Sequence, residues 1–133
     1  MADVELVRSP ELTDTTPYAH ASVVAAGRLV FTAGACPLDK QGNIVFPDDA
    51  AAQARQVMAN LVEALHAAGA ELTDVAKTTV YVASRWREDL VAVWEVVRDA
   101  FGEHDVPSTL VGVAVLGYPE QMVEVEAVAV LPR

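Results

Sequence analysis

Apolar residues recur at helical spacing in two stretches of the chain. Between positions 49 and 68 they stand three or four apart, at Ala54, Val57, Met58, Leu61, Val62 and Leu65. Between about 87 and 101 the same spacing joins Leu90, Val93, Trp94, Val97 and Phe101. This period predicts two amphipathic helices. Asp48 or Asp49 can cap the first helix, and a glycine directly follows each stretch, where helix C-termini favour that residue.

The other apolar stretches alternate with polar positions or are rich in valine, which is typical of β-strands. The predicted strands are residues 21–26, 28–32, 75–83, 109–116 and 122–131. Gly27 separates the first two and predicts a hairpin there. The order of strands, helix, strand, helix and strands predicts an α+β domain. We expect about six strands in a mixed sheet, with both long helices on one face.

The strand predicted over residues 109–116 is apolar on both of its faces. Its two alternating sets are Leu110, Ala114 and Leu116, and Val111, Val113 and Val115. A strand that is apolar on both sides needs cover on both sides, and two helices cover one face of a sheet. We therefore expect other subunits to supply the second cover, which predicts an obligate oligomer with pockets at its subunit boundaries.

Composition and charge narrow the class of protein. The 133 residues suit one domain spanning residues 1–133, and 23 alanines and 23 valines against 6% aromatics favour closely packed layers. Nine Lys and Arg stand against 19 Asp and Glu, for a formal charge of −10. Nucleic-acid binding depends on clustered basic residues. This balance therefore predicts no nucleic-acid partner.

The expected location is the cytoplasm. No apolar run approaches the roughly 20 residues that cross a bilayer, and the acidic start Met-Ala-Asp-Val-Glu differs from the basic start of a secretory signal. The single cysteine, Cys36, has no second cysteine for an intramolecular disulfide. We expect neither a membrane partner nor a disulfide.

Few residues suggest chemistry by type and spacing. Phosphate loops, nucleophile elbows and metal-spaced His and Cys sets are missing, and His20, His66 and His104 stand apart. We expect no metal and no cofactor, with His66 and His104 solvated. Cys36 is interpreted either as a small apolar residue or as a nucleophile.

Glu124 and Glu126 stand two apart in a predicted strand and so share a face. That face is interpreted either as a solvated polar surface or as a cleft that holds a carboxylate for proton transfer.

Several stretches, taken in order, resemble the RidA (reactive intermediate deaminase, YjgF-type) family over nearly the whole chain. They are residues 17–18, 29–34, 37–39, 53–56, 68–69, 74–82 and 123–127. The resemblance implies a chorismate-mutase-like α+β fold and a homotrimer with three clefts between subunits. It also implies that Glu124 is the catalytic glutamate that positions or activates water.

The resemblance further implies a set of substrate-binding positions. Tyr18 and Gly34 match the family pattern, whereas Ala33 stands in place of a serine and Trp94 in place of an asparagine. Thr109 occupies the position of the arginine that grips the substrate carboxylate. Arg85 or Arg87 is interpreted either as a replacement guanidinium or as an exposed base near a helix start. Trp94 is interpreted as a core residue or as a residue that lines the cleft.

The expected function is that of a trimer that binds a small metabolite. The resemblance implies hydrolysis of enamines and imines to 2-oxo acids and ammonia. The alternative is a ligand-binding or regulatory trimer without deaminase activity, which the missing arginine favours. A ribonuclease activity, sometimes attached to this family, fits poorly with the charge of −10.

Overall fold

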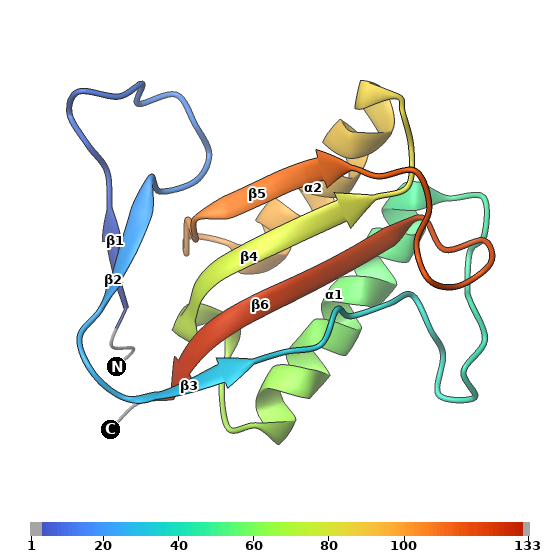
Figure 1. The fold of residues 1–133 in the computed structure, drawn as a ribbon, viewed down its shortest axis with the longest axis horizontal. Coiled ribbons are helices and arrows are strands. Elements are labelled where there is room, and N and C mark those ends of the chain that lie inside the picture. Colours follow the sequence, from blue (N-terminus) through green and yellow to red (C-terminus); the bar gives the residue numbers. More distant parts are fainter. Residues whose placement is uncertain (1–3, 132–133) are drawn as a thin grey trace.

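The computed structural model describes residues 4–131, in which two helices cover one face of a sheet (Figure 1). The elements run in this order: β1 (Val4–Val7), β2 (Ala21–Val24), β3 (Arg28–Phe31), α1 (Ala50–Ala67), the 3-10 turn η1 (Leu72–Asp74), β4 (Val75–Val82), α2 (Arg87–Phe101), β5 (Ser108–Gly112) and β6 (Val123–Leu131). The two predicted helices and the α+β class are confirmed.

The main sheet has the strand order β3-β6-β4-β5. β4 and β5 run parallel, so the chain must cross over between them, and α2 forms this crossover. β6 pairs antiparallel with both β3 and β4, which makes the sheet mixed. β6 and β4 therefore occupy its centre, and each has a hydrogen-bonded strand on both sides.

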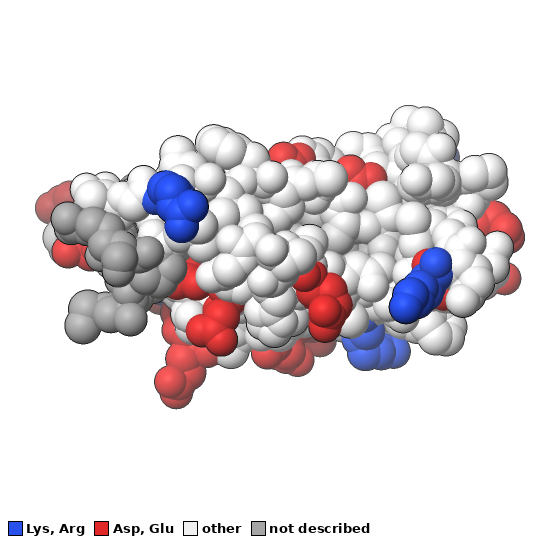
Figure 2. Space-filling view, turned by 90° about the horizontal axis from the view of Figure 1, so that it is seen from below, with Lys and Arg blue, Asp and Glu red and all other residues white. Residues whose placement is uncertain are grey.

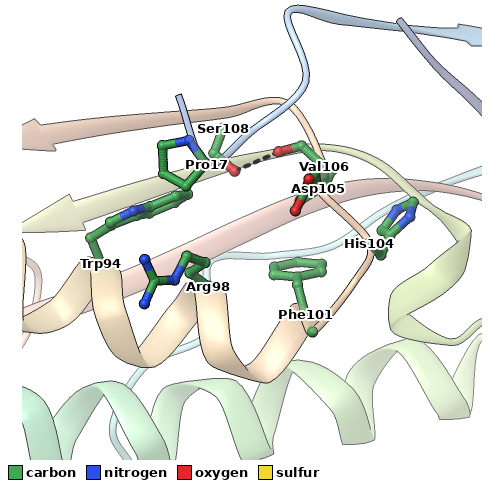
Figure 3. A pocket seen from close by; sticks show the side chains of 9 residues that line it. Pro17, Trp94, Arg98, Phe101, His104, Asp105, Val106 and Ser108 are labelled. Atoms are coloured by element: carbon green, nitrogen blue, oxygen red, sulfur yellow. Dashed lines mark hydrogen bonds between the residues drawn. The ribbon is translucent and has the colours of Figure 1, made fainter. Parts of the chain in front are cut away.

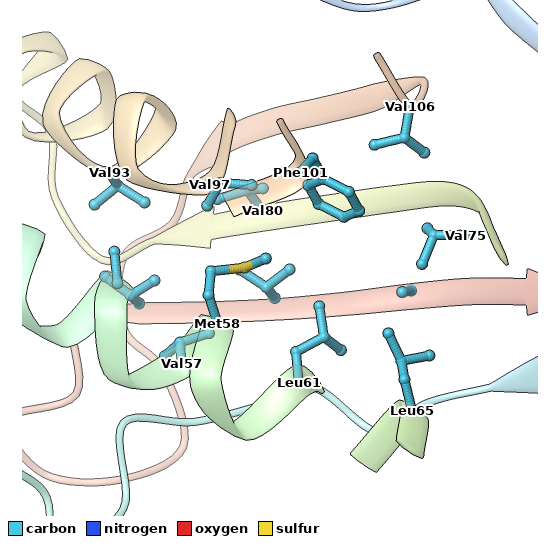
Figure 4. Packing of buried hydrophobic residues seen from close by; sticks show 14 of the residues in the cluster. Val57, Met58, Leu61, Leu65, Val75, Val80, Val93, Val97, Phe101 and Val106 are labelled. Atoms are coloured by element: carbon cyan, nitrogen blue, oxygen red, sulfur yellow. The ribbon is translucent and has the colours of Figure 1, made fainter. Parts of the chain in front are cut away.

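The hydrophobic core lies between the sheet and the helices (Figure 4). The strands contribute valines and the helices contribute valines and leucines, all fully buried: Val80, Val82, Val123, Val125, Val57, Leu61, Leu65, Val93 and Val97. Burial of such side chains is the main stabilising contribution to a domain of this size. The helical period in the sequence correctly marks most residues of α1 and α2 that face this core, whereas Val62 lies outside the cluster.

The predicted helix ends are also confirmed. The Asp49 side chain accepts a hydrogen bond from the backbone N–H of Ala52 at 3.0 Å, which satisfies one of the free donors of the first turn of α1. After α1, Gly69 adopts φ +90°, the left-handed conformation that glycine adopts without strain.

The predicted hairpin around Gly27 is wrong. β2 pairs with β1 over four residue pairs in a separate two-stranded sheet, and β3 pairs with β6. Gly27, at φ +140°, lies against the end of β6, where an added Cβ would be 2.6 Å from the carbonyl oxygen of Leu131. The glycine thus serves a close approach to β6 rather than a tight turn between two strands. The single sheet of about six strands is accordingly divided into sheets of two and four.

The strand predicted over residues 109–116 ends early, at Gly112. A Cβ at Gly112 would lie 2.8 Å from the carbonyl oxygen of Ser84, and the N–H of Val113 turns to the Val82 carbonyl. Val115, predicted to lie in the strand, is 79% exposed in a loop. The sequence argument for a doubly covered strand therefore holds for its first half at most.

Candidate active site

The face of the four-stranded sheet turned away from the helices, here called the open face, carries most of the candidate chemistry. By strand alternation it presents Leu29 and Phe31 from β3, Lys77, Thr79 and Tyr81 from β4, Thr109 and Val111 from β5, and Glu124, Glu126 and Val128 from β6. Glu124 and Glu126 share this face, as their spacing predicts, and both are half-buried.

Glu124 lies near the start of β6, with Val123 and Val125 on either side buried in the core. Its Oε1 accepts a hydrogen bond from Gln121 Nε2 at 3.1 Å and from the Cys36 thiol, whose sulfur is 3.5 Å away. The hydrogen bonds to this carboxylate within residues 4–131 all reach Oε1. Oε2 is therefore the oxygen that a water or a ligand can engage.

Gly34 leaves the space that the Glu124 carboxylate occupies. A Cβ built on Gly34 would overlap Glu124 Oε2, and the Glu124 Cδ would be 2.5 Å away. The segment after β3 is held there by Ala35, whose N–H and carbonyl both pair with Val125, at 2.7 and 3.2 Å. Gly34, which the resemblance implies for the site, is thus required at this position for a steric reason. Its neighbour Ala33 is exposed.

Gln121 is a site residue that the sequence gives no reason to single out. Its side chain is 4% exposed, and Nε2 donates both to Glu124 Oε1 and to the Val123 carbonyl, each at 3.1 Å. Its Oε1 accepts the N–H of Tyr118 at 3.1 Å, which fixes the orientation of the amide. Because these three hydrogen bonds fix the buried amide, it holds the neighbouring carboxylate of Glu124 in one place.

Cys36 is half-buried next to this carboxylate. Burial raises the pKa of its thiol, and the negative charge of Glu124 raises it further. The thiol form also donates to Glu124 Oε1. A thiolate is the nucleophilic form of cysteine, so this environment favours the small-residue interpretation of Cys36 over a nucleophile.

Tyr81 bridges to the second glutamate of the open face. Its hydroxyl donates to Glu126 Oε1 at 2.6 Å, and this bond, followed by partial burial, raises the pKa of Tyr81. One oxygen of Glu126 is thus committed to a neighbouring side chain, whereas Oε2 of Glu124 is not.

Thr109 also lies on the open face, beside the only lysine there. Lys77 Nζ donates to Thr109 Oγ1 at 2.7 Å, and both side chains are exposed. Thr109 pairs with Thr79 in register, and Thr79 pairs with Glu126. The position implied for a substrate-gripping arginine therefore holds a hydroxyl in contact with an ammonium.

Tyr18 and Trp94 meet at a different place, on the helix side of β5. Their rings pack edge to face with centroids 6.1 Å apart, and they line a groove of about 290 Å³ with Pro17, Ser108 and Leu110. Figure 3 shows the adjoining pocket, in which Pro17, Trp94 and Ser108 are joined by Arg98 and Phe101. Trp94 thus contacts the core and also lines a groove. Within one chain this groove lies across the sheet from Glu124.

The remaining candidates take structural or exposed positions. His66 is exposed as expected, but His104 is half-buried and its Nε2 lies 2.7 Å from the Val75 carbonyl, so its prediction as a solvated residue is wrong. Arg85 and Arg87 are both exposed, and Arg85 stacks on Trp86 at 4.6 Å. Among residues 4–131, no three His, Cys, Asp or Glu side chains form a set that could hold a metal ion.

The surface charge is acidic. On the face shown in Figure 2, acidic side chains outnumber basic ones. That face therefore offers no basic stripe of the kind that binds nucleic-acid backbones. Of the described helices, none is both long and apolar enough to cross a membrane.

Comparison with known proteins shows the family to which this chain belongs. The family model described as Endoribonuclease L-PSP matches residues 9–131. The chain belongs to the Rid/YjgF family. A RutC family protein of Pyrococcus horikoshii is 35% identical over 113 residues, covering 85% of this chain and 86% of that one. The 2-iminobutanoate/2-iminopropanoate deaminase of Escherichia coli is 34% identical over 110 residues, covering 80% and 83%.

Solved structures share the fold to different degrees. The Rid protein YyfB of Yersinia pestis superposes with a TM-score of 0.91 at 30% identity, covering 97% of this chain and 99% of that one. Escherichia coli TdcF with bound serine, also 30% identical, gives 0.68 over 96% and 99%. Two solved structures of equal identity thus differ in how closely their arrangement matches this one.

Proposed function

We propose that this Rid/YjgF chain forms a homotrimer whose intersubunit clefts bind a small metabolite, and that Glu124 supports hydrolysis there of imines and enamines to 2-oxo acids and ammonia. The observation that carries the proposal is the held carboxylate of Glu124. Gln121 fixes one oxygen, and Gly34 leaves room for the other. The deaminase relative from Escherichia coli supports the reaction class by its name.

The reaction needs a water and a group that moves its proton. Water bonded to Glu124 Oε2 attacks C2 of the imine; a C–O bond forms as the C=N electron pair moves to nitrogen. The proton leaving the water passes by way of the carboxylate to that nitrogen. The carbinolamine hydroxyl then passes its proton to the nitrogen, again by way of the carboxylate, and the C=O bond forms as the C–N bond breaks, which releases ammonia and a 2-oxo acid. A positioned carboxylate contributes about 10²- to 10⁴-fold to such a step.

The subunit interface of the proposed trimer lies on the apolar part of the open face. Leu29 is 52% and Phe31 is 71% exposed there, and clustered apolar side chains of this size are typical of subunit interfaces. An interface on this face would also enclose Glu124. Light scattering tests the assembly: the expected mass is about three times 14.2 kDa, and a stable monomer at micromolar concentration contradicts it.

Activity is tested by coupled detection of ammonia or 2-oxo acid from imines generated in situ. Glu124→Gln keeps the shape and removes the base, so the rate above spontaneous hydrolysis is expected to vanish. Glu126→Gln is the matched control, because it removes the neighbouring carboxylate of the same strand and face. A Glu124→Gln variant as active as the unmodified protein rules Glu124 out of the mechanism.

A second candidate function is ligand binding without chemistry. It is favoured by one observation, the uncharged Thr109 at the position implied for the substrate-gripping arginine. In that case the trimer binds 2-oxo acids but hydrolyses no imine. On the enzymatic proposal, Thr109→Arg instead raises turnover of 2-iminopropanoate-type substrates, because it adds a bidentate partner for their carboxylate.

A further inference from the structure

We infer that Gln53, a fully buried glutamine of α1, is a positioning residue for Glu124, because its side-chain amide holds the turn from which Gln121 reaches the carboxylate. The inference rests on the proposed function, since it names what fixes the proposed catalytic group in place. The effect of Gln53 on Glu124 passes through Gln121.

The amide of Gln53 binds the backbone on both sides of Gln121. Its Nε2 donates to the carbonyl of Glu120 at 3.0 Å, and its Oε1 accepts the N–H of Met122 at 2.7 Å. These two groups belong to the peptide bonds that precede and follow Gln121. One side chain on a helix therefore restrains the backbone of Gln121 from both ends, and so sets the direction in which that side chain leaves the turn.

The remaining donor of Gln53 reaches a different loop. Nε2 also donates to the carbonyl of Val45 at 3.1 Å, so the amide joins the segment before α1 to the turn before β6. A carboxamide has two N–H donors and one acceptor oxygen, and here every one of them is bonded. Turning the amide over would place its oxygen against two carbonyls and its N–H groups against the N–H of Met122. The bonded groups thus specify one orientation of the amide and one position of the turn.

Both segments that Gln53 joins contain backbone in an unusual conformation. Among residues 4–131, the non-glycine residues with positive φ are Phe46 at +50° and Glu120 at +66°. Phe46 directly follows Val45, and Glu120 itself supplies one of the bonded carbonyls. Left-handed backbone is costly for residues with a Cβ, and it persists where the surrounding structure enforces it, most often at functional sites. The hydrogen bonds of Gln53 supply this restraint to both segments.

The turn passes its position on to Glu124. Gln121 Oε1 accepts the N–H of Tyr118, and Gln121 Nε2 donates to Glu124 Oε1, both at 3.1 Å. Tyr118 and Gln121 belong to the same turn, so releasing this turn from α1 moves the donor together with the group that orients it. Glu124 then keeps its place in β6, but its carboxylate loses the donor that holds it.

The experiment breaks the connection at each end and then at both. Gln53→Met keeps the length of the side chain and removes its hydrogen bonds, whereas Gln121→Met removes the donor to Glu124. In imine hydrolysis, each is expected to lower kcat by about 100-fold, the cost of a displacement of about 1 Å, with KM unchanged within a few-fold. Because the two residues act in series, the double variant is also expected to lose about 100-fold, whereas independent residues would lose about 10⁴-fold. Losses that multiply overturn the inference, and so does full kcat in Gln53→Met.

Two further variants separate positioning from folding. Leu61→Ala removes another fully buried side chain of α1, so it lowers stability but is expected to leave kcat unchanged in the folded protein. Gln53→Glu is the conservative variant: burial favours a protonated carboxyl group, which donates to the Glu120 carbonyl and accepts from Met122. It is expected to keep kcat within a few-fold. Where Gln53→Met does not fold, a folded Gln53→Glu protein that has lost kcat by about 100-fold overturns the inference.

A measurement without turnover distinguishes this failure from failure of the proposed function. The chain has four glutamines and two asparagines, so ¹⁵N labelling gives six side-chain amide signals, and the one from Gln121 is identified by its loss in Gln121→Met. This signal is expected to shift and to exchange faster with solvent in Gln53→Met, and to stay in place in Leu61→Ala. If imines are hydrolysed and Gln53→Met changes neither this signal nor kcat, the positioning role is wrong and the reaction stands. If the signal depends on Gln53 but the unmodified protein hydrolyses no imine, the connection stands and the reaction is wrong.

Discussion

The two faces of the four-stranded sheet are built on the same strands but carry different kinds of side chain. On β4 and β6, Val80, Val82, Val123 and Val125 point to the helices and are fully buried. Between them, Tyr81 and Glu124 point the other way and remain half-buried. Strand alternation alone produces this division, because successive residues face opposite sides.

The difference separates the packing that stabilises the fold from the side chains of the candidate site. The helix-covered face is closed by apolar packing within one subunit, whereas the open face combines exposed apolar side chains with two carboxylates, a phenol and an ammonium. Polar groups of this kind resist burial in a core unless they are paired. The rigid valine layer beneath them fixes their spacing, so the covered face positions the chemistry of the open face.

The largest expected effect is on the free energy of unfolding, and it is found by comparing one substitution on each side of the sheet. Leu61→Ala removes a fully buried side chain of α1 and is expected to lower the free energy of unfolding by about 2–5 kcal/mol. Phe31→Ala, 71% exposed on the open face, is expected to change it by less than about 0.5 kcal/mol at protein concentrations at which the proposed trimer is dissociated. Urea unfolding at low protein concentration measures both. Equal losses from the two substitutions would show that the open face also carries the core of the monomer.

The covered face is the part that the sequence predicts best. Burial follows the helical period in α1 and α2, and Asp49 caps α1 as its position predicts. The period of two also places Glu124 and Glu126 on one face. These patterns are local, because the type and the spacing of neighbouring residues are enough to predict which side chains are buried.

Contacts between distant segments are what the sequence does not reveal. β1 has four residues, too few for a periodic signal, and its pairing with β2 replaces the predicted hairpin. The bond between Lys77 and Thr109 joins residues 32 positions apart, and that of Gln121 with Glu124 depends on the turn before β6. Both follow from strand register and loop geometry, which a single sequence does not specify.

The next largest effect concerns Gly34. Gly34→Ala introduces a Cβ where the Glu124 carboxylate lies, so the carboxylate must move. A displacement of about 1 Å at a catalytic group costs on the order of 100-fold in rate, and we expect a loss of that size in imine hydrolysis with the fold retained by circular dichroism. Gly117→Ala is the matched control, because a Cβ there meets nothing within 4 Å. Full activity in Gly34→Ala contradicts the steric role of this glycine.

A smaller effect is expected at Cys36. Burial and the charge of Glu124 raise the pKa of the thiol, so Glu124→Gln is expected to lower that pKa by removing the charge. Alkylation by iodoacetamide, which needs the thiolate, then begins at lower pH in the variant. Because the chain has one cysteine, intact mass reports this site alone. Identical pH–rate profiles would show that the two groups do not interact in solution.

The smallest expected effect is the alkaline titration of Tyr81. Its pKa is raised because the neutral phenol donates to Glu126. A phenol that holds its proton more tightly in the folded state stabilises the fold fully below the unfolded pKa of about 10. This contribution is lost as pH rises through the higher folded value, since the unfolded chain then binds fewer protons than the folded one. The free energy of unfolding is therefore expected to fall more steeply above about pH 10 in the unmodified protein than in Tyr81→Phe. Glu126→Gln removes the charge but keeps an acceptor, so its slope should lie between the two. Equal slopes in all three proteins would show that the hydrogen bond between Tyr81 and Glu126 does not contribute to the free energy of unfolding.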